Sequence, residues 1–282
     1  MTSHGADDSE ATLEKDDSVD VELREVEAGV YAALVWLNRP DVLNAMDAGL
    51  VAALARALRS ADDDDRVAAI LITGRGRAFS AGGDLKRYMT LQKDPIAFPR
   101  FMDEFHDTVC GIRWLRTPVV ALVNGVTAAG GLELMLGCDF AYVGRSARVS
   151  DGHLNFGQMG GGGVLTMLPR AIGPARAREL VFSGRALSAE QVVEWGLANR
   201  LVEDEALIDE GLKFAAEVAA KSPAAIEAAK YVINAGLANG TGFDDALRLE
   251  RERNALYVLT RPDAHEGLAA FAEKRRPRFP GR

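Results

Sequence analysis

The 282-residue sequence has only two cysteines and no long apolar run. Cys110 and Cys138 are too few for a disulfide framework, and such low cysteine use is typical of proteins in a reducing cytoplasm. Apolar runs such as 68–72 and 119–123 are too short to cross a bilayer. Because the N-terminus has no basic segment followed by an apolar stretch, we expect no secretory signal and a cytoplasmic protein that does not bind membranes.

Basic patches and metal-binding clusters are missing as well. The Lys and Arg residues are scattered and are not interleaved with aromatic side chains, which argues against nucleic acid as a partner. No group of Cys, His and Asp residues has the spacing of metal ligands, so we expect no metal. GRGRAF at 74–79 lacks the full dinucleotide-binding spacing, and no GxxxxGK[ST] motif is present, so these glycines do not indicate a nucleotide site.

Acidic charge is concentrated at the N-terminus. Residues 1–25 contain nine Asp or Glu residues and two basic ones, so seven of the eight net negative charges lie there. Acidic segments rich in Ser and Asp are typical of solvated tails, and we expect residues 1–18 to be disordered. An acidic docking arm is the alternative interpretation.

Beyond residue 18, patterns typical of strands alternate with helical ones. Residues 19–38 predict two strands around a turn, and 67–74 predicts a short buried strand. The spacing of apolar residues at 44–65 predicts a helix with Asp47 as its N-terminal cap. Strands and helices that alternate in this way indicate an α/β core with parallel strands.

The pattern changes after about Leu201. Three amphipathic helical patterns follow one another there with no strand between them. We therefore expect an α/β core at 19–203 and a C-terminal helical region at 204–282. The helical region is predicted to pack on the core or on another subunit.

Two turns rich in small residues are the main functional signal. FSAGGD (79–84) and TAAGGLE (127–133) each follow an apolar strand pattern, where α/β sheets place their ligand clefts. Backbone without side chains allows close approach and leaves N–H groups free to donate. Two such amides that converge on one oxygen form an oxyanion hole. Either turn alone is more simply a packing turn, but two turns with matching placement favour a site.

Several ordered motifs resemble the enoyl-CoA hydratase/isomerase (crotonase) superfamily, over about residues 19–278. They are NRPDVLNAM, RAFSAGGDLK, VNGVTAAGGLELMLGCDFAY, LPRAIG and GLANRLV. The resemblance implies a spiral core of repeated ββα units and a C-terminal helical trimerisation region, assembled as a homotrimer or homohexamer. It also implies an acyl-CoA substrate, with coenzyme A as part of the substrate and no separate cofactor. By position, Ala81 and Gly130 would supply the two amides that hold the thioester oxygen.

The resemblance gives a role to Glu133, a carboxylate within an apolar helical stretch. Polarising a thioester stabilises an enolate, and a carboxylate nearby can then activate water or move a proton. Glu133 matches one of the two glutamates of the family's hydratases. The second is replaced by His153, or by Asp151 if the register slips by two residues. His153 can deliver a proton near neutrality, orient another substrate, or serve only as a structural loop residue.

Further positions are expected to bind coenzyme A. Gly82, Gly83 and Asp84 follow the first turn and would lie along the CoA path, although Asp84 is more simply a helix cap. Phe271 and Lys274 match aromatic and basic positions of the family's C-terminal segment, where they could cover adenine and neutralise a phosphate. A solvated helical tail is the alternative for that segment.

The sequence therefore predicts an enoyl-CoA hydratase-like lyase that adds water to a trans-2-enoyl-CoA. The first alternative is a crotonase-fold hydrolase, decarboxylase or isomerase that uses the same oxyanion hole with another acid–base set. The second is a non-catalytic acyl-CoA-binding protein, in which the missing second glutamate marks lost chemistry. The presence of Glu133 argues against this last alternative.

Overall fold

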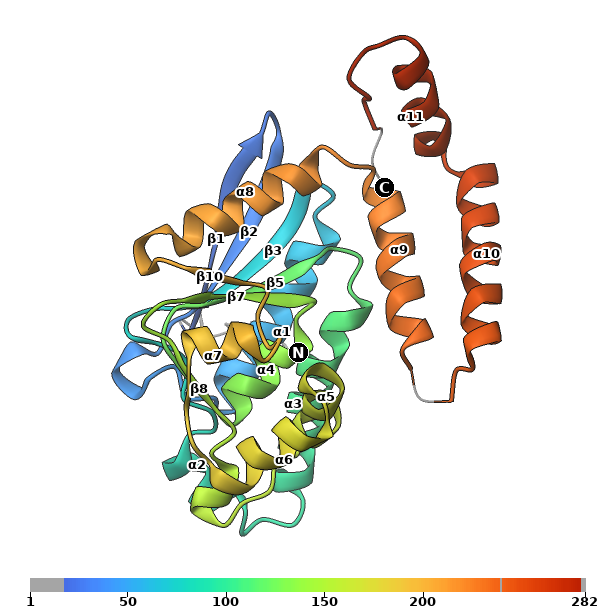
Figure 1. Cartoon of the computed structure of the whole chain (residues 1–282). Coiled ribbons are helices and arrows are strands. Elements are labelled where there is room, and N and C mark those ends of the chain that lie inside the picture. Colours follow the sequence, from blue (N-terminus) through green and yellow to red (C-terminus); the bar gives the residue numbers. More distant parts are fainter. Residues whose placement is uncertain (1–17, 239, 280–282) are drawn as a thin grey trace, which may run out of the picture.

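The computed structural model describes residues 18–238 and 240–279. The acidic tail predicted for residues 1–18 thus lies, except for Ser18, outside the described residues. Figure 1 shows a mixed α/β body from which a group of helices near the C-terminus extends to one side. Within the described residues, no helix is both long enough and apolar enough to span a membrane.

The larger of two sheets has six strands in the order β1-β2-β3-β5-β7-β10. The hairpin predicted at 19–38 is confirmed, because β1 and β2 pair antiparallel. The other neighbours in the sheet are parallel, as expected for an α/β core. The strands are β1 (Val19–Glu27), β2 (Val30–Leu37), β3 (Val67–Gly74), β5 (Val119–Val123), β7 (Phe140–Gly144) and β10 (Arg200–Val202).

A second sheet of four short strands has the order β4-β6-β8-β9. The chain moves from a strand of the large sheet to one of the small sheet in three successive turns, which gives the spiral of the crotonase fold. The consecutive strands β7 and β8 do not pair with each other, since β7 belongs to the large sheet and β8 to the small one. The strands are β4 (Ala78–Ser80), β6 (Val126–Ala128), β8 (Arg148–Ser150) and β9 (Leu187–Ser188).

Alternating side chains of the large sheet enter two separate cores. On β2, Ala33 and Val35 point into the main core, whereas Leu34 points into the other one. Because strand residues alternate between faces, a nearly all-apolar strand can be buried on both sides. Helices line the main core: α1 (Ala48–Asp63), α3 (Ala97–Gly111), α4 (Gly130–Gly137), α5 (Val164–Ile172), α6 (Pro174–Ser183) and α7 (Ala189–Glu194). The second core is closed by α8 (Leu207–Ala219).

Two predicted helix caps are present. The Asp47 side chain accepts a hydrogen bond from the Leu50 amide at 3.0 Å and caps α1. Asp84 accepts one from the Arg87 amide at 3.3 Å and caps α2 (Leu85–Leu91). A carboxylate at this position satisfies an amide that has no partner within the helix.

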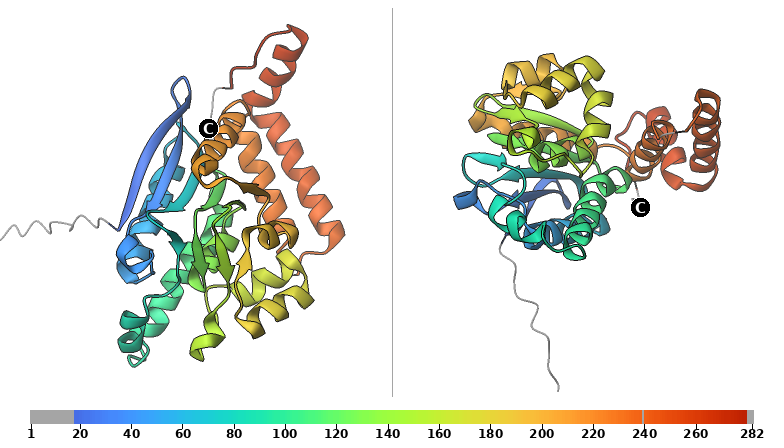
Figure 2. Two further views of the ribbon diagram at one scale, coloured as in Figure 1. Left: turned by 60° about the vertical axis from the view of Figure 1, so that its left-hand side comes forward. Right: turned by 90° about the horizontal axis from the view of Figure 1, so that it is seen from below.

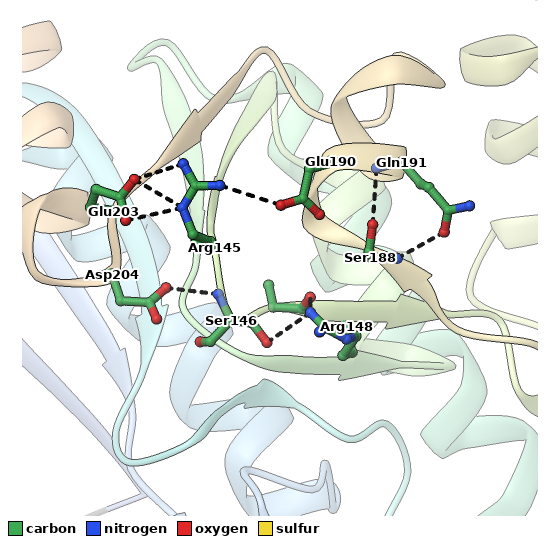
Figure 3. Close-up of polar contacts among 9 residues, drawn as sticks. Arg145, Ser146, Arg148, Ser188, Glu190, Gln191, Glu203 and Asp204 are labelled. Carbon is green, nitrogen blue, oxygen red and sulfur yellow. Dashed lines mark hydrogen bonds and ion pairs between the residues drawn. The ribbon is translucent and has the colours of Figure 1, made fainter.

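Ion pairs on the surface join the two sheets to the following chain (Figure 3). Arg145, in the turn between β7 and β8, pairs with Glu203 at 2.7 Å and with Glu190 at 3.4 Å. Asp204 accepts a hydrogen bond from the Ser146 amide at 3.0 Å. These side chains are exposed, so each pair contributes little to stability, and their effect is to fix the path of the chain.

The last three helices lie beside the core rather than over it (Figure 2). They are α9 (Pro223–Gly236), α10 (Phe243–Thr260) and α11 (Pro262–Ala272). A largely buried ion pair at 2.7 Å between Lys230 on α9 and Asp139 attaches this group to the large sheet. Several large apolar side chains on the group are exposed, among them Phe243, Leu256, Leu259, Leu268 and Phe271.

Candidate active site

A cavity of about 440 Å³ lies where the two glycine turns meet. The turns follow β4 and β6, which are parallel neighbours in the small sheet and therefore end side by side. Gly82 has φ +95°, and a Cβ on it would lie 2.8 Å from the Ala128 carbonyl oxygen and 3.2 Å from the Gly130 nitrogen. Only glycine fits such an approach, so the small residues at both turns serve close contact between them.

The Gly130 amide points out of the first turn of α4, where helix amides have no partner within the helix. Gly130 lines the cavity, and the positive end of the helix dipole adds to its attraction for negative charge. Ala129, which precedes it, has the strained dihedral angles φ 48° and ψ −116°. The Ala129 amide donates a hydrogen bond to the Asp151 carbonyl oxygen at 2.8 Å, and this bond holds the turn in place.

The expectation that Ala81 supplies the second oxyanion donor is wrong. The Ala81 amide donates to the Leu43 carbonyl oxygen at 2.9 Å and is already used. Gly83 lies between two groups that bond to Met46, since the Gly82 oxygen accepts from the Met46 amide and the Asp84 amide donates to the Met46 oxygen. The Gly83 amide points away from this ladder and has no acceptor among the described residues. Gly83 also lines the cavity, so its amide is available to a group bound there.

Glu133 is almost fully buried at the inner wall of the cavity. Its Oε1 accepts hydrogen bonds from the amides of Gly162 at 2.8 Å and Val164 at 3.2 Å. Burial raises the pKa of Glu133, and the positive charge of His153 and the two amide bonds only partly offset this effect. A carboxylate with a raised pKa is a stronger base once ionised, as proton abstraction from water requires.

His153 begins a short 3-10 helix, His153–Phe156, and also lines the cavity. Its Nδ1 lies 2.9 Å from the Oδ1 of Asp151, a side chain that is 1 % exposed. Burial lowers the pKa of His153, but the hydrogen bond to Asp151 and the charges of Asp151 and Glu133 outweigh it, so the pKa is raised. The site thus contains one histidine that favours the protonated form next to two carboxylates.

Of the residues expected to bind coenzyme A, only some lie at the cavity. Gly83 and Asp84 line it, and Gly82 supports the turn behind it. Asp84 also pairs with Arg39 at 3.1 Å. Phe271 and Lys274 are far from the cavity of their own chain, because α11 and α2 lie at opposite ends of the molecule (Figures 1 and 2).

Sequence reasoning missed the partners of Glu133. The amides of Gly162 and Val164 belong to the loop GQMGGGGV, whose run of four glycines was the available signal. A Cβ on Gly162 would lie 2.2 Å from the Phe105 ring and 2.8 Å from Glu133 Oε2. The absence of a side chain there lets the loop approach close enough to bind the carboxylate.

The remaining wall of the cavity is mainly apolar. It suits an acyl group rather than a sugar or a nucleotide base, because few polar atoms line it. The rings of Phe101 and Phe105 are stacked with centroids 6.3 Å apart on α3. Among the described residues, no group of three or more His, Cys, Asp or Glu side chains could hold a metal ion. The apolar part of the wall includes Val42, Leu85, Tyr88, Phe101, Met102, Phe105, Phe156 and Met159.

Comparison with known proteins agrees with this geometry. The family model for enoyl-CoA hydratase/isomerase matches residues 25–282. A mitochondrial enoyl-CoA hydratase from Pongo abelii is 32% identical over 251 residues, which cover 87% of this chain and 82% of the relative. A 1,2-epoxyphenylacetyl-CoA isomerase from Escherichia coli (strain K12) is 35% identical over 265 residues, 92% of this chain and 98% of the relative.

Solved structures give the same result. The enoyl-CoA hydratase from Bacillus anthracis superposes with a TM-score of 0.85 at 29% identity and covers 93% of this chain and 99% of its own. An enoyl-CoA hydratase from Mycobacterium smegmatis gives 0.83 at 31% identity, with 92% and 98% covered. Because this family model matches residues 25–282, which are most of the chain, the chain belongs to the enoyl-CoA hydratase/isomerase family.

Proposed function

We propose that this enzyme adds water across the double bond of a trans-2-enoyl-CoA. The observation that carries the proposal is the convergence of two unpaired amides, a buried carboxylate and a histidine on one apolar cavity. The amides of Gly83 and Gly130 would hold the thioester oxygen. Drawing electrons toward that oxygen makes the β-carbon electrophilic and stabilises the enolate that forms when water adds.

The acid–base steps are assigned to Glu133 and His153. Glu133 takes a proton from water as the water oxygen bonds to the β-carbon, and negative charge moves to the thioester oxygen. Protonated His153 then delivers a proton to the α-carbon and restores the thioester. Transfer of a proton from Glu133 to His153 returns the site to its starting state, so one water is added in total. Each acid–base group is expected to contribute about 10²- to 10⁴-fold to the rate.

Isomerisation is the second candidate, and one observation favours it. The two proposed acid–base groups are a carboxylate, Glu133, and an imidazole, His153, rather than two glutamates, and the relative from Escherichia coli is named an isomerase. The same two groups could move a proton from one carbon of an acyl-CoA to another with no water added.

A panel of enoyl- and β-keto-acyl-CoA thioesters tests these candidates on the wild type, Glu133→Gln and His153→Ala. Hydration of enoyl-CoAs that both substitutions reduce supports the proposal. Full activity in His153→Ala contradicts its role as acid. A shift of the double bond without water uptake favours the isomerase, turnover of β-keto thioesters alone favours a hydrolase or decarboxylase, and binding without turnover favours a non-catalytic protein.

We further propose a homotrimer or homohexamer in which α9–α11 pack on a neighbouring subunit. The exposed apolar side chains of this group support it, because large apolar surfaces of this kind mark protein interfaces. Such packing could bring Phe271 and Lys274 to the coenzyme A of another subunit. Light scattering measures the mass directly, and a monomer at working concentration would contradict the proposal.

A cytoplasmic location and the lack of any separate cofactor stay predictions.

A further inference from the structure

We propose that Asp151 is a positioning residue, which fixes the imidazole of His153 so that Nε2 is the nitrogen presented to the substrate. The inference rests on the proposed function, because it assigns His153 as the proton donor of that site. Asp151 has no place in the chemistry described above, and it does not line the cavity. It would act only through the ring that it holds.

The contacts of the His153 ring determine which of its two nitrogens is available to a substrate. Asp151 Oδ1 lies 2.9 Å from His153 Nδ1, so this nitrogen carries its proton toward the carboxylate. The Nδ1 and Cε1 edge also packs on the loop backbone, because a Cβ on Gly160 would lie 3.3 Å from both atoms. Among the described residues, Nε2 has no hydrogen-bond partner. It is therefore the nitrogen left for a substrate in the cavity.

Asp151 is itself held firmly, which is what a positioning residue requires. Its side chain is 1 % exposed, and a carboxylate so buried is retained only when paired. Its backbone oxygen accepts from the Ala129 amide at 2.8 Å. Ala129 directly precedes the oxyanion donor Gly130. One residue thus ties the imidazole to the turn that holds the thioester oxygen, and it fixes the distance between the two.

The charges around the ring support the same role. Asp151 and Glu133 are the charged groups that act on His153, and both favour its protonated form. With Asp151 bonded to Nδ1 and Glu133 also lining the cavity, the imidazolium can give its proton to carbon while Asp151 holds the ring in position.

Nuclear magnetic resonance of the histidines tests the proposal without any assay of activity. The sequence has four histidines, so their titrations can be separated by substitution. In Asp151→Asn, the pKa of His153 should fall, because the hydrogen bond and the charge of Asp151 both raise it. A downfield imidazole N–H signal in the wild type should disappear in His153→Ala, which tests the hydrogen bond even if Asp151 variants fold poorly.

Kinetics supply the second readout. Asp151→Asn should lower kcat about 10- to 100-fold with little change in KM, since loss of a well-placed acid removes part of its 10²- to 10⁴-fold contribution. The loss of activity at high pH should begin at lower pH, and Asp151→Glu should restore part of the rate. The matched control Asp107→Asn, on the exposed side of α3, should behave as wild type.

The outcomes separate this proposal from the proposed function. An unchanged His153 titration in Asp151→Asn, or no downfield signal in the wild type, overturns the positioning role whatever reaction is catalysed. A lowered pKa of His153 in an enzyme that turns over no enoyl-CoA supports the positioning of the ring and overturns hydration.

Discussion

Glu133 Oε1 accepts a hydrogen bond from the Gly162 amide at 2.8 Å, although the two residues are 29 positions apart. This contact places a carboxylate at the inner wall of an apolar cavity and keeps its second oxygen available. The bond needs a loop without side chains, because a Cβ on Gly162 would overlap the Phe105 ring. The glycine run and the buried glutamate therefore function together.

Glu133→Gln is expected to remove the base while preserving the fold. The amide oxygen of glutamine can still accept from Gly162, so the thermal midpoint should change little. The rate of hydration should fall by about 10²- to 10⁴-fold because no group remains to take the proton of water. Steady-state kinetics with a short enoyl-CoA measure this, with the exposed Glu104→Gln as control. Retention of the wild-type rate would exclude Glu133 as the base.

Gly162→Ala should impair both stability and rate. The new methyl group would lie 2.2 Å from the Phe105 ring, so the loop must move and the hydrogen bond to Glu133 lengthens. Overpacking of this kind costs about 1–3 kcal/mol. Gly111→Ala is the matched control, since no atom lies within 4 Å of a Cβ placed there. Thermal unfolding and kcat should be affected in the first variant and not in the second.

Substitution by proline distinguishes Gly83 from Ala81. Gly83→Pro removes an amide that makes no hydrogen bond, so kcat should fall about 10²- to 10³-fold, as for loss of one oxyanion donor. Gly83→Ala keeps the amide, and its Cβ meets only the Tyr88 ring at 3.9 Å, so it should lose far less. Ala81→Pro breaks the bond to Leu43 and should lower the thermal midpoint. Equal loss of kcat in Gly83→Pro and Gly83→Ala would contradict an oxyanion role for the Gly83 amide.

The pH dependence of kcat/KM should be bell-shaped. Glu133 must be ionised, and since its pKa is raised, activity should fall on acidification at a higher pH than for an ordinary glutamate. His153 must be protonated, and since its pKa is raised, activity should persist above the usual histidine value before it declines. A profile of kcat/KM against pH measures both limbs. If the fall in kcat/KM at high pH is lost in His153→Ala, it is caused by deprotonation of His153. If the fall persists in this variant, another group causes it.

Lys230→Met should destabilise the chain by about 3 kcal/mol, because it leaves the partly buried Asp139 without its ion-pair partner. The Lys230 side chain is 8% exposed, and the double variant with Asp139→Asn should recover part of the loss. Lys213→Met breaks a surface pair with Glu210 and should destabilise the chain far less. Chemical denaturation measures all three, and equal losses for Lys230→Met and Lys213→Met would contradict a structural role of the buried pair.

Local patterns predicted much of the fold. The apolar alternation of β2 and the Asp47 cap of α1 depend on near neighbours in the chain, so they can be read without the tertiary structure. Glu133 was noticeable because it interrupts an apolar helix. The sequence predicts Ala81 as an oxyanion donor, but contacts of Leu43 and Met46 with the turn decide which N–H is free. Such long-range contacts leave no periodic signal in the sequence.

The contacts of Glu133 and His153 also depend on tertiary packing, so the sequence does not predict their geometry. Asp151 and His153 are only two residues apart, but the geometry of their contact depends on the packing of the ring against Gly160. The coenzyme A contacts predicted for Phe271 and Lys274 follow from the family resemblance alone. Their distance from the cavity follows from the direction in which α9–α11 leave the core, which is set by tertiary packing.

The strained backbone of Ala129 affects where the molecule should first open when it is heated. Its backbone has φ 48° and ψ −116°, a conformation that glycine adopts freely and alanine does not. Strain of this kind costs about 1–3 kcal/mol, and here it is held in place by the Asp151 carbonyl oxygen. Local opening on heating should therefore begin at the turn around Ala129. Ala129→Gly would relieve the backbone strain, but it would hold the Gly130 amide in the cavity less precisely.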